Sequence, residues 1–235
     1  MSPPIVDLTH TLHSRIPIYP GDPPFASSCA TCVPKDGYAV AALSLGSHSG
    51  THIDAPAHFL VNARTVDQLA LDELVGRAVV LDLTSIASEK KAISKAELEE
   101  ALERTWLQAA ENREQMPMLL IHTGWSRYWD SEDKKKYYAH PFLSRGAAEY
   151  ILELGFKVLG VDTLSPDETR LEDEEEGDED AFIVHMKILG ADGIIAENLT
   201  NLGVLGDGDG WMVHLVPLKI ESCDGSPVRA FATRD

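Results

Sequence analysis

Short apolar runs, enriched in β-branched residues and bounded by turn residues, recur along the chain and predict β-strands. These runs occupy residues 5–10, 38–46, 77–84, 118–123, 156–163, 211–221 and 228–233. Helical patterns are fewer. Ser94 and Glu97 form a capping box ahead of one helical pattern, over 98–110. Ser144 precedes a second one, over 145–155, which ends in a glycine as a helix commonly does.

The order of these elements indicates the fold class. In the middle of the chain the order is strand, helix, strand, helix, strand, and both flanks are rich in strands. This order favours an α/β fold in which helices pack on a mixed β-sheet. The chain has 235 residues, of which 44% are hydrophobic and 25% charged, an ordinary globular composition. We therefore expect a single domain over residues 1–235.

Neither end of the chain nor its interior carries a membrane signal. No apolar run approaches the roughly 18 residues that a membrane span requires. The first ten residues lack the basic start and the long apolar segment of a secretory signal. We expect a protein that does not associate with membranes and that is cytoplasmic.

Acidic residues dominate the charge. The chain has 38 acidic and 20 basic residues, a formal net charge of −18. About half of this excess lies in residues 167–180, DETRLEDEEEGDED, which we interpret as an acidic surface loop within the domain because so charged a segment resists burial. The loop lacks the ligand spacing and central glycine of a calcium loop. The overall acidity argues against nucleic acid and anionic membranes as partners.

Three cysteines, Cys29, Cys32 and Cys223, are too few and odd in number for a disulfide framework. Cys29 and Cys32 have the spacing of a redox or zinc motif. They follow a proline-rich segment rather than opening a helix, and no second such pair exists. We interpret them as incidental.

The segment HSGTHIDAPAHF, residues 48–59, concentrates three histidines and an aspartate. If the chain is extended here, His52 and Asp54 lie two residues apart and share one side. His48 reaches the same point if the chain turns at Gly50. Two imidazoles and a carboxylate that converge form a divalent metal site of mixed nitrogen and oxygen ligands, suited to zinc, manganese or iron.

Three protein ligands leave coordination positions open, which is the arrangement of a catalytic metal rather than a structural one. A single histidine would more often be an ordinary hydrogen-bonded residue. The combination of three histidines and an aspartate, separated by a glycine and a proline, favours the metal site.

The same segment resembles the HxGTHxDxPxHF signature of the cyclase-like metal-dependent hydrolase family, which includes bacterial kynurenine formamidases and isatin hydrolases. All fixed positions of the signature match. Further similar segments are VDLTHTL, YPGDPP, TGWSRYW, HPFLS, GVDTLSPD, VHMKILG, AENLTNL and IESCDGSPVRAFA, so the resemblance covers nearly the whole chain. It implies a cyclase-like fold of the swivelling β/β/α type and a homo-oligomer, a dimer or tetramer.

The resemblance also implies roles for individual residues. His48, His52 and Asp54 would bind a first metal ion, and Asp54 would bridge to a second ion held by His185 and Glu197. The cofactor would be one or two divalent ions per chain, zinc or manganese.

Two departures from the family pattern leave the number of ions open. Val184 stands where many relatives have a second histidine, and the acidic insertion lies just upstream. From its own surroundings, His185 is equally consistent with a core histidine, and Glu197 with a helix or loop cap.

His58 is our candidate for the catalytic proton carrier, because a neutral imidazole can both accept and return a proton near neutral pH. Relatives use the matching histidine in this way. Alternatively, His58 only orients Asp54 through a hydrogen bond. Trp125 could line a pocket for a flat substrate, or be a core aromatic residue. The remaining histidines, which we expect to be structural, are His10, His13, His122, His140 and His214.

These features together predict a metal-dependent amidohydrolase that acts on a small molecule such as an aryl formamide or a cyclic amide. Covalent catalysis has no candidate, since the chain has neither a GxSxG motif nor a cysteine paired with a histidine in sequence. The alternatives are a cyclase or lyase that uses the same metal as a Lewis acid, and a non-catalytic module that binds metal. The presence of His58 alongside the three proposed ligands favours an enzyme over a non-catalytic metal-binding module.

Overall fold

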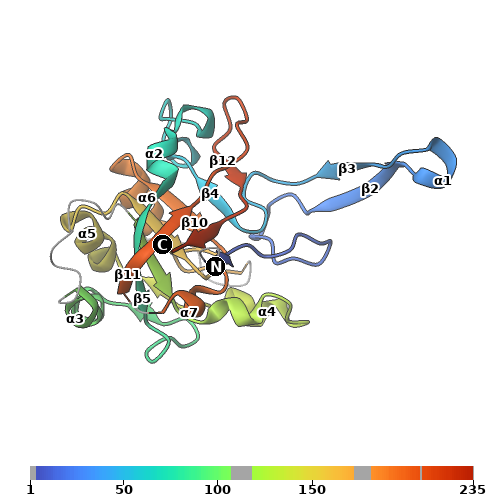
Figure 1. Ribbon diagram of the computed structural model, residues 1–235. Helices are drawn as coiled ribbons and strands as arrows, with labels where there is room; N and C mark the ends of the chain where they lie inside the picture. The colour runs from blue at the N-terminus through green and yellow to red at the C-terminus, as the bar shows by residue number, and fades with distance from the viewer. Residues whose placement is uncertain (1–3, 107–117, 172–180, 207, 235) are drawn as a thin grey trace.

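The computed structural model describes residues 4–106, 118–171, 181–206 and 208–234, and a nine-stranded sheet forms its centre (Figure 1). Across the sheet, the strands are β1 (Ile5–Asp7), β13 (Phe231–Thr233), β11 (Gly208–His214), β5 (Val75–Asp82), β7 (Met118–His122), β9 (Val158–Val161), β10 (Ile194–Glu197), β4 (His52–Asp54) and β12 (Gly225–Pro227). Strands from both ends of the chain meet in this one sheet.

Parallel pairing is confined to the middle of the sheet. β5, β7, β9 and β10 run parallel in that order, and every other pair in the sheet is antiparallel. The four parallel strands are apolar and almost entirely buried, as strands covered on both faces are. The predicted α/β fold with a mixed sheet is therefore confirmed.

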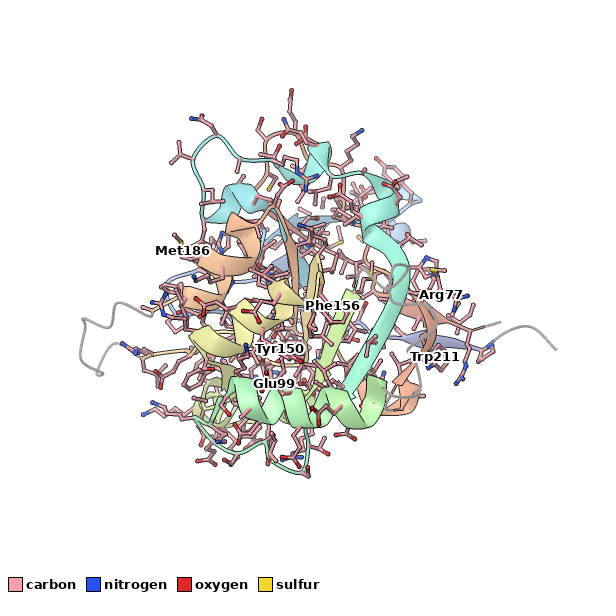
Figure 2. All side chains as sticks on the ribbon, turned by 90° about the vertical axis from the view of Figure 1, so that its left-hand side faces the viewer. Arg77, Glu99, Tyr150, Phe156, Met186 and Trp211 are labelled. Carbon is pink, nitrogen blue, oxygen red and sulfur yellow. The ribbon has the colours of Figure 1, made fainter. Side chains whose placement is uncertain are left out.

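Three helices cover one face of the parallel strands: α3 (Lys95–Trp106), α5 (Arg145–Glu153) and α6 (Ile183–Gly190). Figure 2 views the molecule from the side of this layer, with Glu99 of α3, Tyr150 of α5 and Met186 of α6 labelled. The predicted caps are present: Glu97 accepts a hydrogen bond from the backbone N–H of Ser94 at 2.8 Å, and the Ser144 hydroxyl accepts one from the N–H of Ala147 at 3.2 Å. Residues 107–110 of the first predicted helix lie outside the described residues.

On the opposite face, side chains from distant strands of the same sheet pack against one another. Ile53 of β4 and Val213 of β11 pack into one cluster with Val80 and Leu120 from the central strands. Residues from distant strands meet in this way because the sheet curls around the cluster. β4 thereby carries one side chain into this core and the neighbouring side chains away from it.

A two-stranded ribbon departs from the prediction. β2 (Ala26–Thr31) and β3 (Val40–Ser44) pair with each other and not with the central sheet, and the ribbon projects from the body with the short helix α1 (Val33–Asp36) at its tip (Figure 1). The strand predicted over 38–46 thus exists, but its apolar residues are exposed. The apolar run between turn residues predicts a strand but carries no information about which strands it joins.

Several strands are shorter than predicted, and the largest difference is at the C-terminal end of one of them. The pattern over 211–221 predicts a single strand, whereas β11 ends at His214. Pro217 follows three residues later and cannot donate to a ladder, which limits the strand to the residues before it. The short strands β4, β10 and β12 were not among the predicted ones.

The remaining elements are small. They are the helices α2 (Leu71–Leu74), α4 (Lys134–Tyr138) and α7 (Leu202–Leu205), the 3-10 helices η1 (Pro56–His58), η2 (Val66–Gln68) and η4 (Trp125–Tyr128), and the paired strands β6 (Ala92–Ile93) and β8 (Phe142–Leu143). Within the ranges that the structure describes, no helix has both the length and the apolar character needed to cross a bilayer.

Candidate metal centre and pocket

The motif residues lie on and around β4, which runs between β10 and β12 and is completely buried. Because the strand is extended, His52 and Asp54 share one side, as predicted, and Ile53 points into the core on the other. The predicted turn is also present. Gly50 has φ +70°, a left-handed backbone conformation that favours glycine, and a Cβ atom there would displace the end of the Leu12 side chain.

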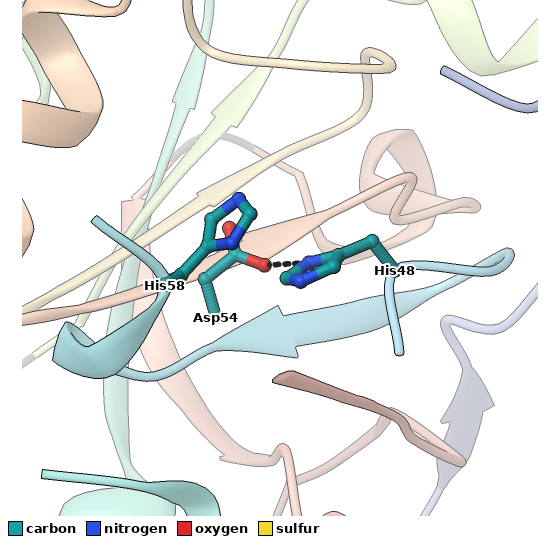
Figure 3. Close-up of side chains that lie close together, drawn as sticks. All are labelled: His48, Asp54 and His58. Carbon is teal, nitrogen blue, oxygen red and sulfur yellow. Dashed lines mark hydrogen bonds and ion pairs between the residues drawn. The ribbon is translucent and has the colours of Figure 1, made fainter. Parts of the chain in front are cut away.

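This turn brings His48 back to the strand. Its Nδ1 lies 2.6 Å from Asp54 Oδ1 (Figure 3). His58, from η1, lies on the other side of Asp54 in the same view, and its ring centroid is 3.9 Å from that of His48. These three residues form one set whose ligand atoms all lie within 4.8 Å of one another.

A second set also includes Asp54. The register of β10 against β4 places Glu197 opposite His52, and Glu197 Oε2 lies 3.3 Å from His52 Nε2. His52, Asp54 and Glu197 again have ligand atoms within 4.8 Å. His185, on α6, approaches the same set: its Nε2 is 3.2 Å from Glu197 Oε1 and 3.5 Å from Asp54 Oδ2. The five predicted ligands therefore converge, with Asp54 common to both sets.

The second set carries buried polar atoms that have no hydrogen bond: His52 Nε2, Asp54 Oδ2 and Glu197 Oε1. His52 Nδ1 lies 2.8 Å from the Gly50 carbonyl, so the proton resides there and Nε2 presents a lone pair. A lone pair facing carboxylate oxygens in a buried site is costly unless a cation lies between them. Imidazole nitrogen and carboxylate oxygen are the donors that zinc and manganese accept. The residues present thus fit a divalent cation.

The protonation of the cluster reflects its excess of carboxylates. Burial alone would lower the pKa of His48, but the Asp54 and Asp224 carboxylates outweigh burial and raise this pKa to about 10. Burial alone would raise the pKa of Asp54, whereas the imidazoles of His52 and His48 hold it well below its usual value. The pKa of His185 is raised well above its usual value, because adjacent carboxylates outweigh its burial. The site thus attracts positive charge, as a metal centre does.

Asp167 opens the segment 167–180 that was predicted to be an acidic surface loop, but it is itself buried and holds His185 in place. Its Oδ2 accepts hydrogen bonds from His185 Nδ1 at 2.6 Å and from the His185 backbone at 3.0 Å, while Oδ1 accepts one from the Val184 N–H at 2.8 Å. Asp167 is 2% exposed. A charged residue is buried here because three donors at the start of α6 satisfy it. Residues 172–180 lie outside the described residues.

Asp224 is the residue that sequence reasoning missed. It precedes β12, and its Oδ2 accepts hydrogen bonds from His48 Nε2 at 2.9 Å and from His58 Nδ1 at 3.1 Å. It belongs to the segment IESCDGSPVRAFA, which carried only the family resemblance. A lone aspartate in a polar stretch offers no local signal, because its role depends on the pairing of β12 with β4.

A pocket of about 400 Å³ opens over the cluster. The catalytic candidate His58 and the metal ligand candidates His48, His52, His185 and Glu197 line it. The rest of its wall is largely aromatic and apolar and comprises Tyr19, Pro20, Phe59, Leu164 and Phe182, with Gly21, Asp22 and Ser165. The arrangement combines a polar floor with walls suited to a flat ring.

Trp125 is not part of this pocket, so its assignment as a substrate-binding residue is wrong. The side chain is 2% exposed, and its indole N–H donates to the Tyr137 carbonyl at 3.0 Å. It packs in a separate core cluster with Ile16, Trp129 and Leu164. The alternative of a core aromatic residue is the one observed.

The other histidines and the cysteines lie apart from the two ligand sets. His10 stacks on Trp129, His13 contacts Asp130, His122 lies near Asp82, His140 bonds to Thr169, and His214 stacks on Phe231. Cys29 and Cys32 are in the projecting ribbon, and all three cysteines are free. Cys223 lies beside Asp224, with its Sγ 3.8 Å from Asp224 Oδ1.

The sheet and this histidine and carboxylate cluster define a class of protein, and comparison with known proteins specifies it. Residues 6–168 match the family described as "Putative cyclase". Over 226 residues the chain is 31% identical to the kynurenine formamidase of Bacillus cereus, covering 96% of this chain and 95% of that protein. Over 228 residues it is 30% identical to the kynurenine formamidase of Bacillus anthracis, with the same coverage. The chain belongs to the cyclase family.

Solved structures show the same fold. Isatin hydrolase A from Ralstonia solanacearum superposes with a TM-score of 0.81 at 26% identity, covering 99% of this chain and 92% of that one. Isatin hydrolase A from Labrenzia aggregata, bound to benzyl benzoate, gives a TM-score of 0.82 at 23% identity, covering 98% and 93%. The mixed sheet with its helical layer is therefore the cyclase-like fold that the sequence predicted.

Proposed function

We propose that this protein hydrolyses the amide bond of a small aromatic substrate, an aryl formamide or a cyclic aryl amide, with one or two divalent ions, zinc or manganese. The chain is a metal-dependent amidohydrolase, since its relatives over the whole length are named kynurenine formamidase and isatin hydrolase. The observation that carries the proposal is the set of buried, unpaired ligand atoms at the floor of an aromatic pocket.

The pocket supports an aromatic substrate. Phe59 and Phe182 lie with ring centroids 5.4 Å apart, and Tyr19 lies 6.1 Å from Phe182. Rings at these separations offer faces and edges to a further ring. Leu164 adds aliphatic surface. An amide attached to such a ring would reach the histidines and carboxylates below.

The proposed ligands divide around Asp54. His48 and His52 would hold one ion together with Asp54, and His185 and Glu197 would hold a second. His52 lies where the two sites meet, with its Nε2 3.2 Å from Asp54 Oδ1 and 3.3 Å from Glu197 Oε2. A divalent metal bound here lowers the pKa of a water molecule and polarises a carbonyl group. Asp167 fixes the ring of His185, and the Gly50 carbonyl fixes that of His52, so the ligand nitrogens are oriented in advance.

His58 is the proposed proton carrier. Its Nδ1–H donates to Asp224, which leaves Nε2 of the neutral ring as the acceptor. His58 takes a proton from water as the new C–O bond forms, and it returns that proton to nitrogen as the C–N bond breaks. The products are a carboxylate and an amine, and the second proton of the water is released to solvent.

The test is release of formate from N-formylaniline, with ring opening of isatin measured alongside. N-ethylformamide, which lacks the ring, is the matched control substrate. We expect turnover of one of the two aromatic substrates, loss of turnover after treatment with a chelator, and recovery with zinc or manganese. A metal-loaded protein that turns over neither substrate would contradict hydrolysis. Metal-dependent consumption without water uptake would identify a cyclase or lyase.

We also propose that the protein is cytoplasmic and forms a homo-oligomer, a dimer or tetramer. The projecting ribbon supports assembly: Val33, Tyr38, Val40 and Leu43 are all at least 48% exposed. Residues 26–44 contain one lysine and one aspartate, so they are neutral in a chain of net charge −18 and repel a second copy least. Light scattering should give the mass of an oligomer, and a Leu43→Lys variant should shift it toward the monomer. A monomeric parent would refute this proposal.

A further inference from the structure

Asp224 is fixed against the motif strand by its backbone. Its carbonyl accepts a hydrogen bond from the Ala55 N–H at 2.9 Å, and the next residue, Gly225, pairs with Asp54 in the sheet. A Cβ atom on Gly225 would lie 2.5 Å from His48 Cε1. The backbone therefore approaches the His48 ring as closely as a glycine allows, and this approach brings the Asp224 carboxylate to His48 and His58.

One oxygen of this carboxylate serves two rings. Oδ2 accepts from His48 Nε2 at 2.9 Å and from His58 Nδ1 at 3.1 Å. Both rings face this one oxygen, and an aspartate carboxylate is an anion at neutral pH. An anion can only accept, and each ring nitrogen that faces it must therefore carry a proton.

We propose that Asp224 is a positioning residue that fixes the tautomer of His58 and the orientation of the His48 ring together. On His58, a proton held on Nδ1 leaves Nε2 as the base. On His48, the same oxygen holds Nε2 at 2.9 Å, so the ring turns its Nδ1 toward Asp54 Oδ1 at 2.6 Å, where a cation would bind. The expected effect on turnover rests on the proposed function, whereas the positions of the two rings follow from the two hydrogen bonds alone.

The shared oxygen also links two parts of the site. His48 and His58 both belong to the first ligand set, where His48 is a proposed metal ligand and His58 the proposed proton carrier, and their ring centroids lie 3.9 Å apart. A carboxylate between them keeps the base at a constant distance from the metal site. Asp224 itself is in neither ligand set of the described residues, so its effect is exerted through the two histidines.

The isosteric variant Asp224→Asn tests this role. An amide presents one acceptor and two donors, so it cannot accept from both rings in the same way. At saturating zinc, and with whichever of N-formylaniline and isatin the parent hydrolyses, we expect kcat to fall about 10-fold to 100-fold, with KM changed less than about threefold. In a His58→Ala background the same change should have little further effect on kcat. Glu221→Gln, which removes one exposed negative charge from the same segment, is the matched control and should resemble the parent.

A readout independent of activity comes from ¹⁵N-histidine NMR of the zinc-loaded protein, with the His58 signals assigned by their loss in His58→Ala. We expect the parent to hold the His58 proton on Nδ1, and Asp224→Asn to shift it toward Nε2. A parent with the proton on Nε2, or a variant with an unchanged tautomer, would overturn the inference. If the parent hydrolyses no formamide or cyclic amide, the proposed function fails while the NMR result still decides the role of Asp224. Additive losses of kcat in the variant that combines Asp224→Asn with His58→Ala would also overturn the inference about Asp224.

Discussion

Replacing His140 with glutamine should make the protein less sensitive to acid. His140 is 1% exposed, its Nδ1 donates to the Pro141 carbonyl at 2.9 Å, and its Nε2 accepts from the Thr169 hydroxyl at 2.7 Å. Burial lowers the pKa of His140 from 6.5 to about 4. The ring is thus neutral in the folded protein and free to bind a proton in the unfolded one.

The sign and size of the effect follow from linkage. Between the two pKa values the unfolded state binds more protons, so the stabilisation is complete above about pH 6.5 and is lost as pH falls toward about 4. A shift of this size corresponds to about 3 kcal/mol in full, at roughly 1.4 kcal/mol per unit. Between about pH 7.5 and about pH 5, His140 should account for about 2 kcal/mol of lost stability.

Urea unfolding of the parent and of His140→Gln, both stripped of metal, measures this difference. The variant should be less stable at about pH 7.5, because it loses a well-placed hydrogen-bonding group, but its stability should fall by about 2 kcal/mol less on acidification. Contributions from His10 and from the metal site are common to both proteins and cancel. An equal fall in the two proteins would show that His140 already takes up its proton in the folded state, and would refute the reasoning.

Three further predictions concern the pocket and its surroundings. His58→Ala should cut turnover by roughly 10² to 10⁴ while zinc stays bound, measured by kinetics and elemental analysis; near-parental turnover at saturating metal would exclude a proton carrier. Deleting residues 171–180 should preserve fold and metal content, since Asp167 remains, whereas loss of one of two bound ions would show that the segment positions the site. Phe182→Ala should raise KM for an aromatic substrate about tenfold, or about 1.4 kcal/mol, and leave KM for N-ethylformamide unchanged, whereas equal effects on both would contradict stacking.

Local patterns were sufficient for the parts of the molecule that depend on local geometry. The extended chain at His52 and Asp54 and the turn at Gly50 follow from residue spacing and from the conformational freedom of glycine. The caps of the helices at Ser94 and Ser144 depend on residues within three positions of one another. Each of these features was predicted and is present.

Features that depend on distant parts of the chain were predicted only through the family resemblance or not at all. Glu197 faces His52 because β10 pairs with β4, across 145 positions of sequence that no local pattern spans. In the sequence, Asp167 looks like one more acidic residue in a charged run. In the structure it is buried, and its carboxylate accepts hydrogen bonds from three donors. Asp224 acts through a pairing of the same long range. The exposure of the β2 and β3 ribbon was not predicted, because an apolar run bounded by turns indicates that a strand forms but not where the strand lies.

The central claim is that Asp54 joins two sets of ligands into one metal centre. Elemental analysis of the parent, of Asp54→Ala and of the control Glu221→Gln, all purified without chelator, tests it most directly. The account predicts zinc or manganese in the parent and in the control, and loss of every bound ion in Asp54→Ala, since the carboxylate is common to both sets. Equal metal content in the parent and in Asp54→Ala would contradict it.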